Sequence, residues 1–199
     1  MARPKQSEYR RGFKADAQRI AAEVRRELRL GQLQAILPHR LAEHLAIPIV
    51  PLQSLDAPHD AVQHFVAAEP SAFSAVTVFR GSERIVVYND AHAPVRQTSD
   101  ITHELAHALL MHPPHVAVDA TTGCRVFHGE IEREAEYLSG VILVTDAAAV
   151  SIVRTGQDVS DAARHFGVSR HMVVYRINIS GARQRGTPKG ATFATRRAG

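Results

Sequence analysis

The sequence has one cysteine, no tryptophan and no long apolar stretch. The single Cys124 has no partner for an intramolecular disulfide, which excludes a small fold held together by disulfides. No segment approaches the roughly 18 consecutive apolar residues of a membrane-spanning helix. Residues 1–14 lack the apolar core and the small-residue cleavage site of a secretory signal, so we expect a soluble cytoplasmic protein.

What is present is an ordinary globular composition, with 45% hydrophobic and 22% charged residues among 199. This suits one compact domain with a small appendage and excludes a disordered or collagen-like chain. Charge is uneven: residues 1–14 carry +4 and residues 183–199 carry +5, while the whole chain carries +4. We therefore expect an acidic body and flexible basic ends at residues 1–12 and 183–199. Two interpretations stay open, weak contact with nucleic-acid phosphates or a role in solubility alone.

The spacing of apolar residues predicts the elements of the first half of the chain. Apolar residues recur from Phe13 to Leu28 at the spacing of one buried helix face, which predicts a first helix. Two β-branched runs around Gly81 predict a hairpin. The elements expected after the first helix are a helix starting at Pro38, a strand at 47–50, a helix near 62–66, and hairpin strands at 75–80 and 84–88.

Helices dominate the second half. Thr98 or Ser99 is expected to cap a helix from Ile101 to Met111, and the prolines at 113–114 end it. The further helices expected are one at 130–144 and two short ones within 160–179, on either side of Gly167. Helices next to a small sheet of few strands predict an α+β fold.

The helix at 101–111 contains the sequence His103-Glu104-Leu105-Ala106-His107. Two histidines four residues apart project from one helix face, so both imidazoles can reach one zinc ion. In this H-E-x-x-H arrangement, the glutamate deprotonates a water acidified by zinc, and that water attacks a peptide carbonyl. The alternative is a helix whose histidines only face solvent.

A catalytic zinc needs a third protein ligand. The longer pattern H-E-x-x-H-x-x-G-x-x-H is excluded, because Leu110 and Pro113 stand at its glycine and histidine positions. His112 is nine residues from His103, about 900° around a helix, which points it to the opposite side. We therefore interpret His112 and His115 as surface or loop histidines.

The acidic helix after residue 129 is the remaining source of a ligand. Its four glutamates form two pairs one turn apart, Glu130 with Glu134 and Glu132 with Glu136. Only one pair can face a metal held by the histidine helix, and the spacing alone does not choose between them. The alternative is a charged face in contact with water.

The segments HELAHALLMH and EREAEYLSGVILVT, preceded by a hairpin and a loop with Arg96, resemble the ImmA/IrrE family of metallo-endopeptidases. The resemblance runs from about residue 12 to residue 182. Aligned on Ala135, Glu132 takes the family's ligand position and Glu134 its Glu/Gln position. The sequence departs from the family pattern at Glu136, at residues 138–139 and at Thr145.

The resemblance implies a zincin-like metallopeptidase domain at residues 13–150 and a helix-turn-helix-like helical subdomain at 151–182. It implies one zinc ion held by His103, His107 and Glu132, with Glu104 as the general base. The same ligands also accept manganese, iron or cobalt. Glu136, on the face of Glu132, is expected to accept a hydrogen bond from a zinc-bound imidazole.

The implied function is endopeptidase cleavage of a helix-turn-helix repressor, which releases stress or mobile-element genes. The substrate is expected to pair as an extended strand with an edge of the hairpin. Tyr88, Arg96 and Tyr137 are candidates to stabilise the oxyanion, although a structural role is the simpler interpretation for each. A protein that retains the metal but only sequesters its partner is a further alternative.

A rival function comes from residues 161–177. Ala163, Gly167 and Val173 have the spacing of a helix-turn-helix unit, with Arg170 and His171 at the start of its second helix. These residues favour a DNA-binding regulator whose metal is structural or absent. Arg176 argues against it, because the unit usually has an apolar residue at that position.

Overall fold

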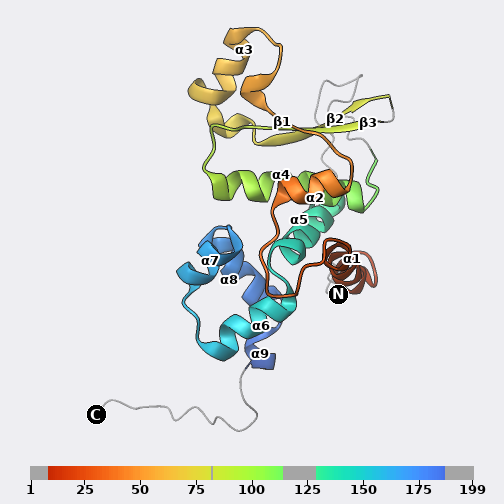
Figure 1. The fold of residues 1–199 in the computed structure, drawn as a ribbon, viewed down its shortest axis with the longest axis vertical. Helices are drawn as coiled ribbons and strands as arrows, with labels where there is room; N and C mark the ends of the chain where they lie inside the picture. Colours follow the sequence, from red (N-terminus) through yellow and green to blue (C-terminus); the bar gives the residue numbers. More distant parts are fainter. Residues whose placement is uncertain (1–8, 82, 114–128, 187–199) are drawn as a thin grey trace, which may run out of the picture.

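The computed structural model describes residues 9–81, 83–113 and 129–186 (Figure 1). Cys124 and His115 lie outside the described residues. The elements, in chain order, are α1 (Phe13–Glu27), α2 (Pro38–His44), β1 (Ile49–Pro51), the 3-10 helix η1 (Leu52–Ser54), α3 (His59–Gln63), the π-helix η2 (His64–Ala68), the 3-10 helix η3 (Pro70–Ala72), β2 (Ala75–Arg80), β3 (Glu83–Tyr88), α4 (Pro94–Leu109), α5 (Gly129–Leu143), α6 (Asp146–Thr155), α7 (Val159–Phe166), α8 (Arg170–Ile179) and α9 (Ala182–Gly186).

A small mixed sheet lies at one end of the molecule (Figure 1). Its strand order is β1-β3-β2, with β1 parallel and β2 antiparallel to β3, and Thr77 stands opposite Val86. The predicted hairpin is confirmed, and Gly81 at its turn has φ of 64°, a conformation that favours glycine. Because β3 is central, β2 is an edge strand of the sheet among the described residues.

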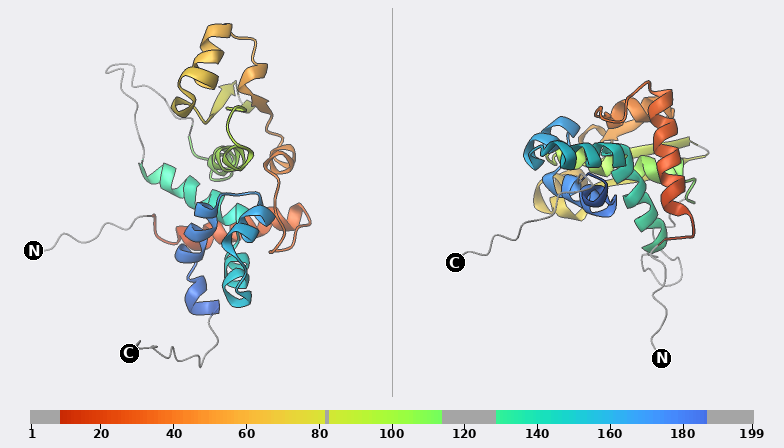
Figure 2. Two further views of the ribbon diagram at one scale, coloured as in Figure 1. Left: turned by 90° about the vertical axis from the view of Figure 1, so that its left-hand side faces the viewer. Right: turned by 90° about the horizontal axis from the view of Figure 1, so that it is seen from below.

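Helices α4, α5 and α1 form successive layers on one side of this sheet, and α3 lies on its other side (Figures 1 and 2). α4 lies against β2 and β3, α5 packs along α4, and α1 packs against α5. Leu105 of α4, Leu138 of α5 and Ala17 of α1 are completely buried in this stack. The α+β class is confirmed, and the layering places α4 between the sheet and α5.

α4 begins earlier than expected. It starts at Pro94, whose fixed φ suits the first turn of a helix, so a cap at Thr98 or Ser99 is wrong. Both residues lie within the helix: Ser99 Oγ donates to the carbonyl of Val95, and the backbone carbonyl of Thr98 accepts from the hydroxyl of Thr102. The segment expected as a loop therefore forms the first turns of the helix that carries His103.

The C-terminal helices pack below α5 in Figure 1. The predicted pair around Gly167 is confirmed as α7 and α8, and Ser169 Oγ caps α8 by accepting from the amide of Met172. α6 was not expected. It is short and carries apolar residues such as Ala147 on its exposed side, which weakens the periodic pattern of an amphipathic helix. Thr145 caps it by accepting from the amide of Ala148.

Arg176 takes the inward position that a helix-turn-helix unit usually gives to an apolar residue. Its side chain is completely buried, and its guanidinium donates to the carbonyl of Val144 and to Asp146. A Cβ on Gly140 of α5 would lie 3.0 Å from Arg176 Cδ, so the glycine allows α8 to approach closely. Arg176 thereby joins α8 to the end of α5 and the start of α6.

Three of the expected domain boundaries fall within the described residues and can be compared with the helices. The boundary between residues 150 and 151 falls inside α6, residues 9–12 lead into α1, and residues 183–186 belong to α9. The rest of the two basic ends, 1–8 and 187–199, lies outside the described residues. The division into domains stays a prediction.

Within residues 9–81, 83–113 and 129–186, no single helix is long and apolar enough to cross a membrane. Taken together, α5 and α6 would be long and apolar enough, by length and composition alone, but the two helices are bent by 55° relative to each other.

Candidate metal centre

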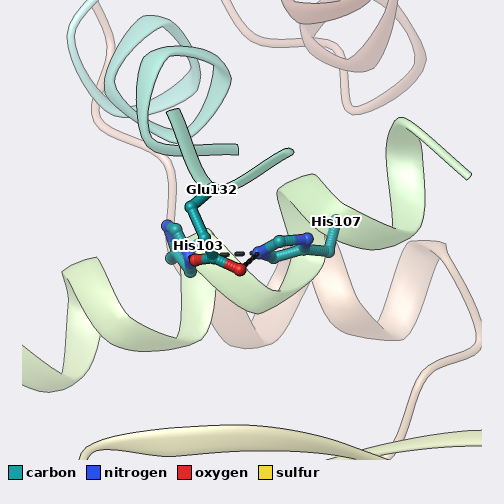
Figure 3. A group of neighbouring side chains, drawn as sticks. All are labelled: His103, His107 and Glu132. Atoms are coloured by element: carbon teal, nitrogen blue, oxygen red, sulfur yellow. Dashed lines mark hydrogen bonds and ion pairs between the residues drawn. The ribbon is translucent and has the colours of Figure 1, made fainter. Parts of the chain in front are cut away.

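The structure brings His103, His107 and Glu132 together between α4 and α5 (Figure 3). The two Nε2 atoms are 3.1 Å apart, and the Glu132 carboxylate lies 3.1 Å from His103 Nε2 and 3.6 Å from His107 Nε2. The histidines share one face of α4 because they are four residues apart. Glu132 reaches them from the first turn of α5, which packs along α4.

These three side chains fit a divalent metal ion. Each offers one ligand atom, and the ligand atoms all lie within 4.8 Å of one another. Two imidazole nitrogens and one carboxylate oxygen form a donor set typical of catalytic zinc, which leaves a fourth position for water or substrate. His107 is buried, whereas His103 and Glu132 are partly exposed, so one side of the group faces solvent.

Electrostatics couples the three groups. A hydrogen bond with His103, then one with His107, holds the pKa of Glu132 well below its ordinary value. Burial alone lowers the pKa of His103, but the hydrogen bond to Glu132 and the charges of Glu104 and Glu136 outweigh it, so that pKa is raised. In the protein without metal, the Glu132 carboxylate and the protonated form of His103 therefore stabilise each other.

Glu104 lies between the cluster and the sheet. Its Oε2 accepts a hydrogen bond of 2.6 Å from the hydroxyl of Thr77 on β2. Glu104, Thr77, His107 and Glu132 line the same small cavity of about 100 Å³, together with Val76 and other side chains. Thr77 was missed because its role depends on the packing of β2 on α4, which no local pattern of residues encodes.

His112 lies in the loop after α4, as one of the two expectations had it, but it is buried against the cluster and not at the surface. α4 ends at Leu109, and Met111 follows with φ of 52°, so the chain turns back and a helical projection no longer applies. His112 is 8% exposed, and its Nδ1 lies 3.0 Å from His107 Nδ1. Its Nε2 lies 3.6 Å from the carboxylate of Glu134.

Glu134 and Glu136 differ in their surroundings. Glu134 is buried and forms an ion pair of 3.3 Å with Arg10; burial raises its pKa and Arg10 opposes that rise. Glu136 is exposed, and its negative charge contributes to the raised pKa of His103. Nδ1 of His107 faces His112, so His107 is not the imidazole that donates to Glu136, and a hydrogen bond from His103 to Glu136 stays a prediction.

The three residues considered as oxyanion stabilisers make contacts within the fold and away from the cavity. Tyr88 is buried at the end of β3, and Tyr137 is buried among the rings of Tyr9 and Phe13. Arg96 donates to Ser74 Oγ. None of the three candidates is among the described residues that line the cavity beside Glu104.

Arg170 and His171 are exposed in the first turn of α8, the second helix of the pair. α8 packs against α6, α7 and α9, below α5 in Figure 1, whereas the His-His-Glu cluster lies between α5 and α4. The structure therefore separates these two residues from the candidate metal centre, and their role stays a prediction.

The Peptidase_M78 family model, described as the IrrE N-terminal-like domain, matches residues 50–178. The chain belongs to this family. The resemblance seen in the motifs is thereby confirmed, and the IrrE N-terminal-like region carries α4, α5 and the cavity between α4 and β2. The family makes this a domain of metallopeptidase type. α1 and α2 precede the matched residues.

A solved structure described as a Mycobacterium tuberculosis transcriptional regulator is similar to this chain, with 16% sequence identity and a TM-score of 0.48. The similarity covers 84% of this chain and 46% of that structure, so the IrrE-like chain spans less than half of its length. A comparison with curated proteins finds no match.

Proposed function

We propose that this IrrE-like protein is a zinc-dependent endopeptidase. One observation carries the proposal: the ligand atoms of His103, His107 and Glu132 gather within 4.8 Å, while Glu104 lines the cavity beside them. Membership of a metallopeptidase family supports the same chemistry. The group combines a set of metal ligands with a carboxylate that can act as a base, which peptide hydrolysis requires.

In the proposed mechanism, His103, His107 and Glu132 hold the ion. When bound, zinc polarises a peptide carbonyl and lowers the pKa of water. Glu104 accepts the proton of the attacking water and delivers it to the departing amine. Thr77 holds the Oε2 side of that carboxylate by its hydrogen bond, which leaves Oε1 for the proton.

The edge strand β2 supports the binding of an extended peptide. Its other edge pairs with β3, and its side chains alternate between the α4 side, where Thr77 lies, and solvent, where Val76 and Val78 are 42% and 44% exposed. A substrate strand added along β2 gains backbone hydrogen bonds. Because Thr77 contacts Glu104, this edge passes directly beside the general base.

We propose a helix-turn-helix transcriptional repressor as the substrate, whose cleavage releases stress or mobile-element genes. The support is the resemblance to the ImmA/IrrE family over the segments HELAHALLMH and EREAEYLSGVILVT. A repressor would present a segment between its domains as the extended strand. Incubation of purified repressors with the zinc-loaded protein, followed by mass spectrometry of new termini, tests this assignment.

Glu104→Gln separates metal binding from catalysis. The variant keeps the size and the hydrogen-bond acceptor of Glu104 but cannot take a proton, so we expect one zinc per chain and no cleavage. The measurement is elemental analysis beside the appearance of new peptide termini in a library of unstructured peptides. Full cleavage by Glu104→Gln would remove Glu104 from the mechanism.

The second candidate is DNA binding by α7 and α8, which the exposed Arg170 and His171 at the start of a capped α8 favour. Gel-shift titration with duplex DNA tests it. Binding that survives His103→Ala and disappears with Arg170→Ala would support a regulator in which the metal has no direct role. The absence of any shift at low salt would exclude this candidate.

A further inference from the structure

We propose that His112, backed by Glu134, is a positioning residue that holds the His107 imidazole in the orientation and tautomer in which Nε2 faces the metal. The inference rests on the proposed metal site. It assigns a role to two buried polar side chains that neither the H-E-x-x-H motif nor the peptidase mechanism uses.

The turn after α4 places His112 on the back of His107. The amide of Met111 donates to the carbonyl of Ala108, and the amide of His112 donates to the carbonyl of His107, both at 3.0 Å. This pair of bonds is a Schellman motif, which folds the chain back over the last helical turn. Arg84 adds a hydrogen bond of 3.3 Å to the carbonyl of His112, so β3 also holds this segment.

The distances assign the protons. His107 Nε2 faces His103 and Glu132, so a metal bound there uses its lone pair, and the proton of His107 must sit on Nδ1. That Nδ1 lies 3.0 Å from Nδ1 of His112, which therefore accepts the hydrogen bond and carries its own proton on Nε2. The Nε2–H group is directed to Glu134, whose carboxylate lies 3.6 Å away.

Burial makes this arrangement specific. The side chains of His112 and Glu134 are 9% and 8% exposed, so water competes little for their polar atoms. Glu134 is held in turn by Arg10, which extends the chain of contacts from His107 to the segment before α1. Because His112 contacts the nitrogen of His107 that faces away from the cluster, its role is to orient a ligand rather than to bind the metal.

The experiment compares His112→Phe, His112→Asn and His112→Gln in the full-length chain. Asn places an oxygen where Nδ1 stood, Gln places one where Nε2 stood, and Phe places none. The readout is the zinc dissociation constant, measured by competition with a chromogenic chelator. Loss of such a partner weakens metal binding by roughly 10- to 100-fold, so we expect that weakening for Phe and Gln and near wild-type affinity for Asn.

His59→Phe is the matched control, because His59 is exposed at the start of α3 on the far side of the sheet (Figure 1). We expect its zinc affinity to equal that of the wild type. A second readout is the NMR signal of the Nδ1 proton of His107 in the zinc-loaded protein. It should be protected from exchange in the wild type and in His112→Asn, and lost in His112→Gln.

The outcomes are distinguishable. Wild-type protein that binds zinc while all three His112 variants bind it equally well would overturn the positioning role and leave the metal site standing. A zinc affinity of His112→Asn no higher than that of His112→Gln would also overturn the positioning role. This comparison of two polar side chains can be made even if His112→Phe does not fold. Wild-type protein that binds no zinc would remove the proposed function itself.

Discussion

At the scale of single residues, the hydrogen bond between Thr77 and Glu104 connects the sheet to the proposed general base. At 2.6 Å it is a short bond to a carboxylate, and bonds to charged groups are stronger than neutral ones. The hydroxyl holds Glu104 from the strand that we propose as the substrate-binding edge. Under the proposed mechanism, Thr77 therefore positions both the substrate strand on β2 and Glu104, the proposed general base.

Thr77→Val is expected to lower kcat by roughly 10-fold, because a hydrogen bond to a charged group is worth about 1.5–3 kcal/mol and part of it orients the carboxylate. Valine keeps the shape and the β-propensity of threonine but lacks the hydroxyl. Zinc content should not change. Thr77→Ser should restore most of the activity, and equal kcat in Thr77→Val and the wild type would contradict the role.

The residues of the site differ in how far the sequence determines them. His103, Glu104 and His107 could be predicted because their relation depends only on the pitch of one helix. Glu132 required the family resemblance, because the spacing of the four glutamates left two pairs open. His112 was missed because a non-glycine residue, Met111, adopts the left-handed conformation that reverses the chain.

At the scale of elements, the end of α4 carries a conformational cost. Met111 has φ of 52° in the position of a Schellman motif that usually holds glycine. Its side chain is 83% exposed, so packing does not compensate for the left-handed backbone. The turn is kept by the buried His112 that follows and by Arg84, which bonds to the carbonyl of His112.

Met111→Gly should therefore stabilise the protein by about 0.5–1 kcal/mol, since relief of the left-handed strain exceeds the added entropy of the unfolded chain. Urea denaturation with circular dichroism measures the change. Zinc affinity should stay the same, because His112 keeps its place. A destabilised Met111→Gly variant would show that the methionine side chain contributes packing at this turn.

Element prediction succeeded where the pattern is periodic or the turn is marked. α1, the hairpin, and the α7 and α8 pair follow from apolar spacing and from glycines with positive φ at Gly81 and Gly167. α6 was missed because it is only ten residues long and carries apolar residues such as Ala147 on its exposed side, which weakens the periodic pattern. The sequence predicts the start of α4 at Ile101 and not at Pro94, because residues 96–100 are all polar and show no apolar helix face.

At the scale of the whole molecule, Arg25 connects helices that are distant in sequence. It is 1% exposed, and its guanidinium donates to the carbonyls of Gly31, Gln34 and Ile142 at 2.8–2.9 Å. Burial lowers its pKa from the ordinary value, but arginine keeps its charge at neutral pH. Through this side chain, α1 and the segment after it hold the C-terminal end of α5.

Arg25→Met should lower the free energy of unfolding by roughly 3 kcal/mol or more, because three carbonyls lose a charged donor inside the protein. Arg25→Lys should recover only part of this, since one ammonium group cannot reproduce the planar fork of donors. Chemical denaturation of the two variants and the wild type measures both effects. A change within about 0.5 kcal/mol, as for ordinary surface substitutions, would contradict the role of Arg25.

The most direct test of the central claim is the zinc content per chain of the purified protein, measured by elemental analysis beside Glu132→Ala. The account predicts one zinc per wild-type chain and its loss or sharp weakening in the variant, because two histidines alone do not hold a catalytic zinc. No zinc in the wild-type protein, even after zinc is supplied, would contradict the account.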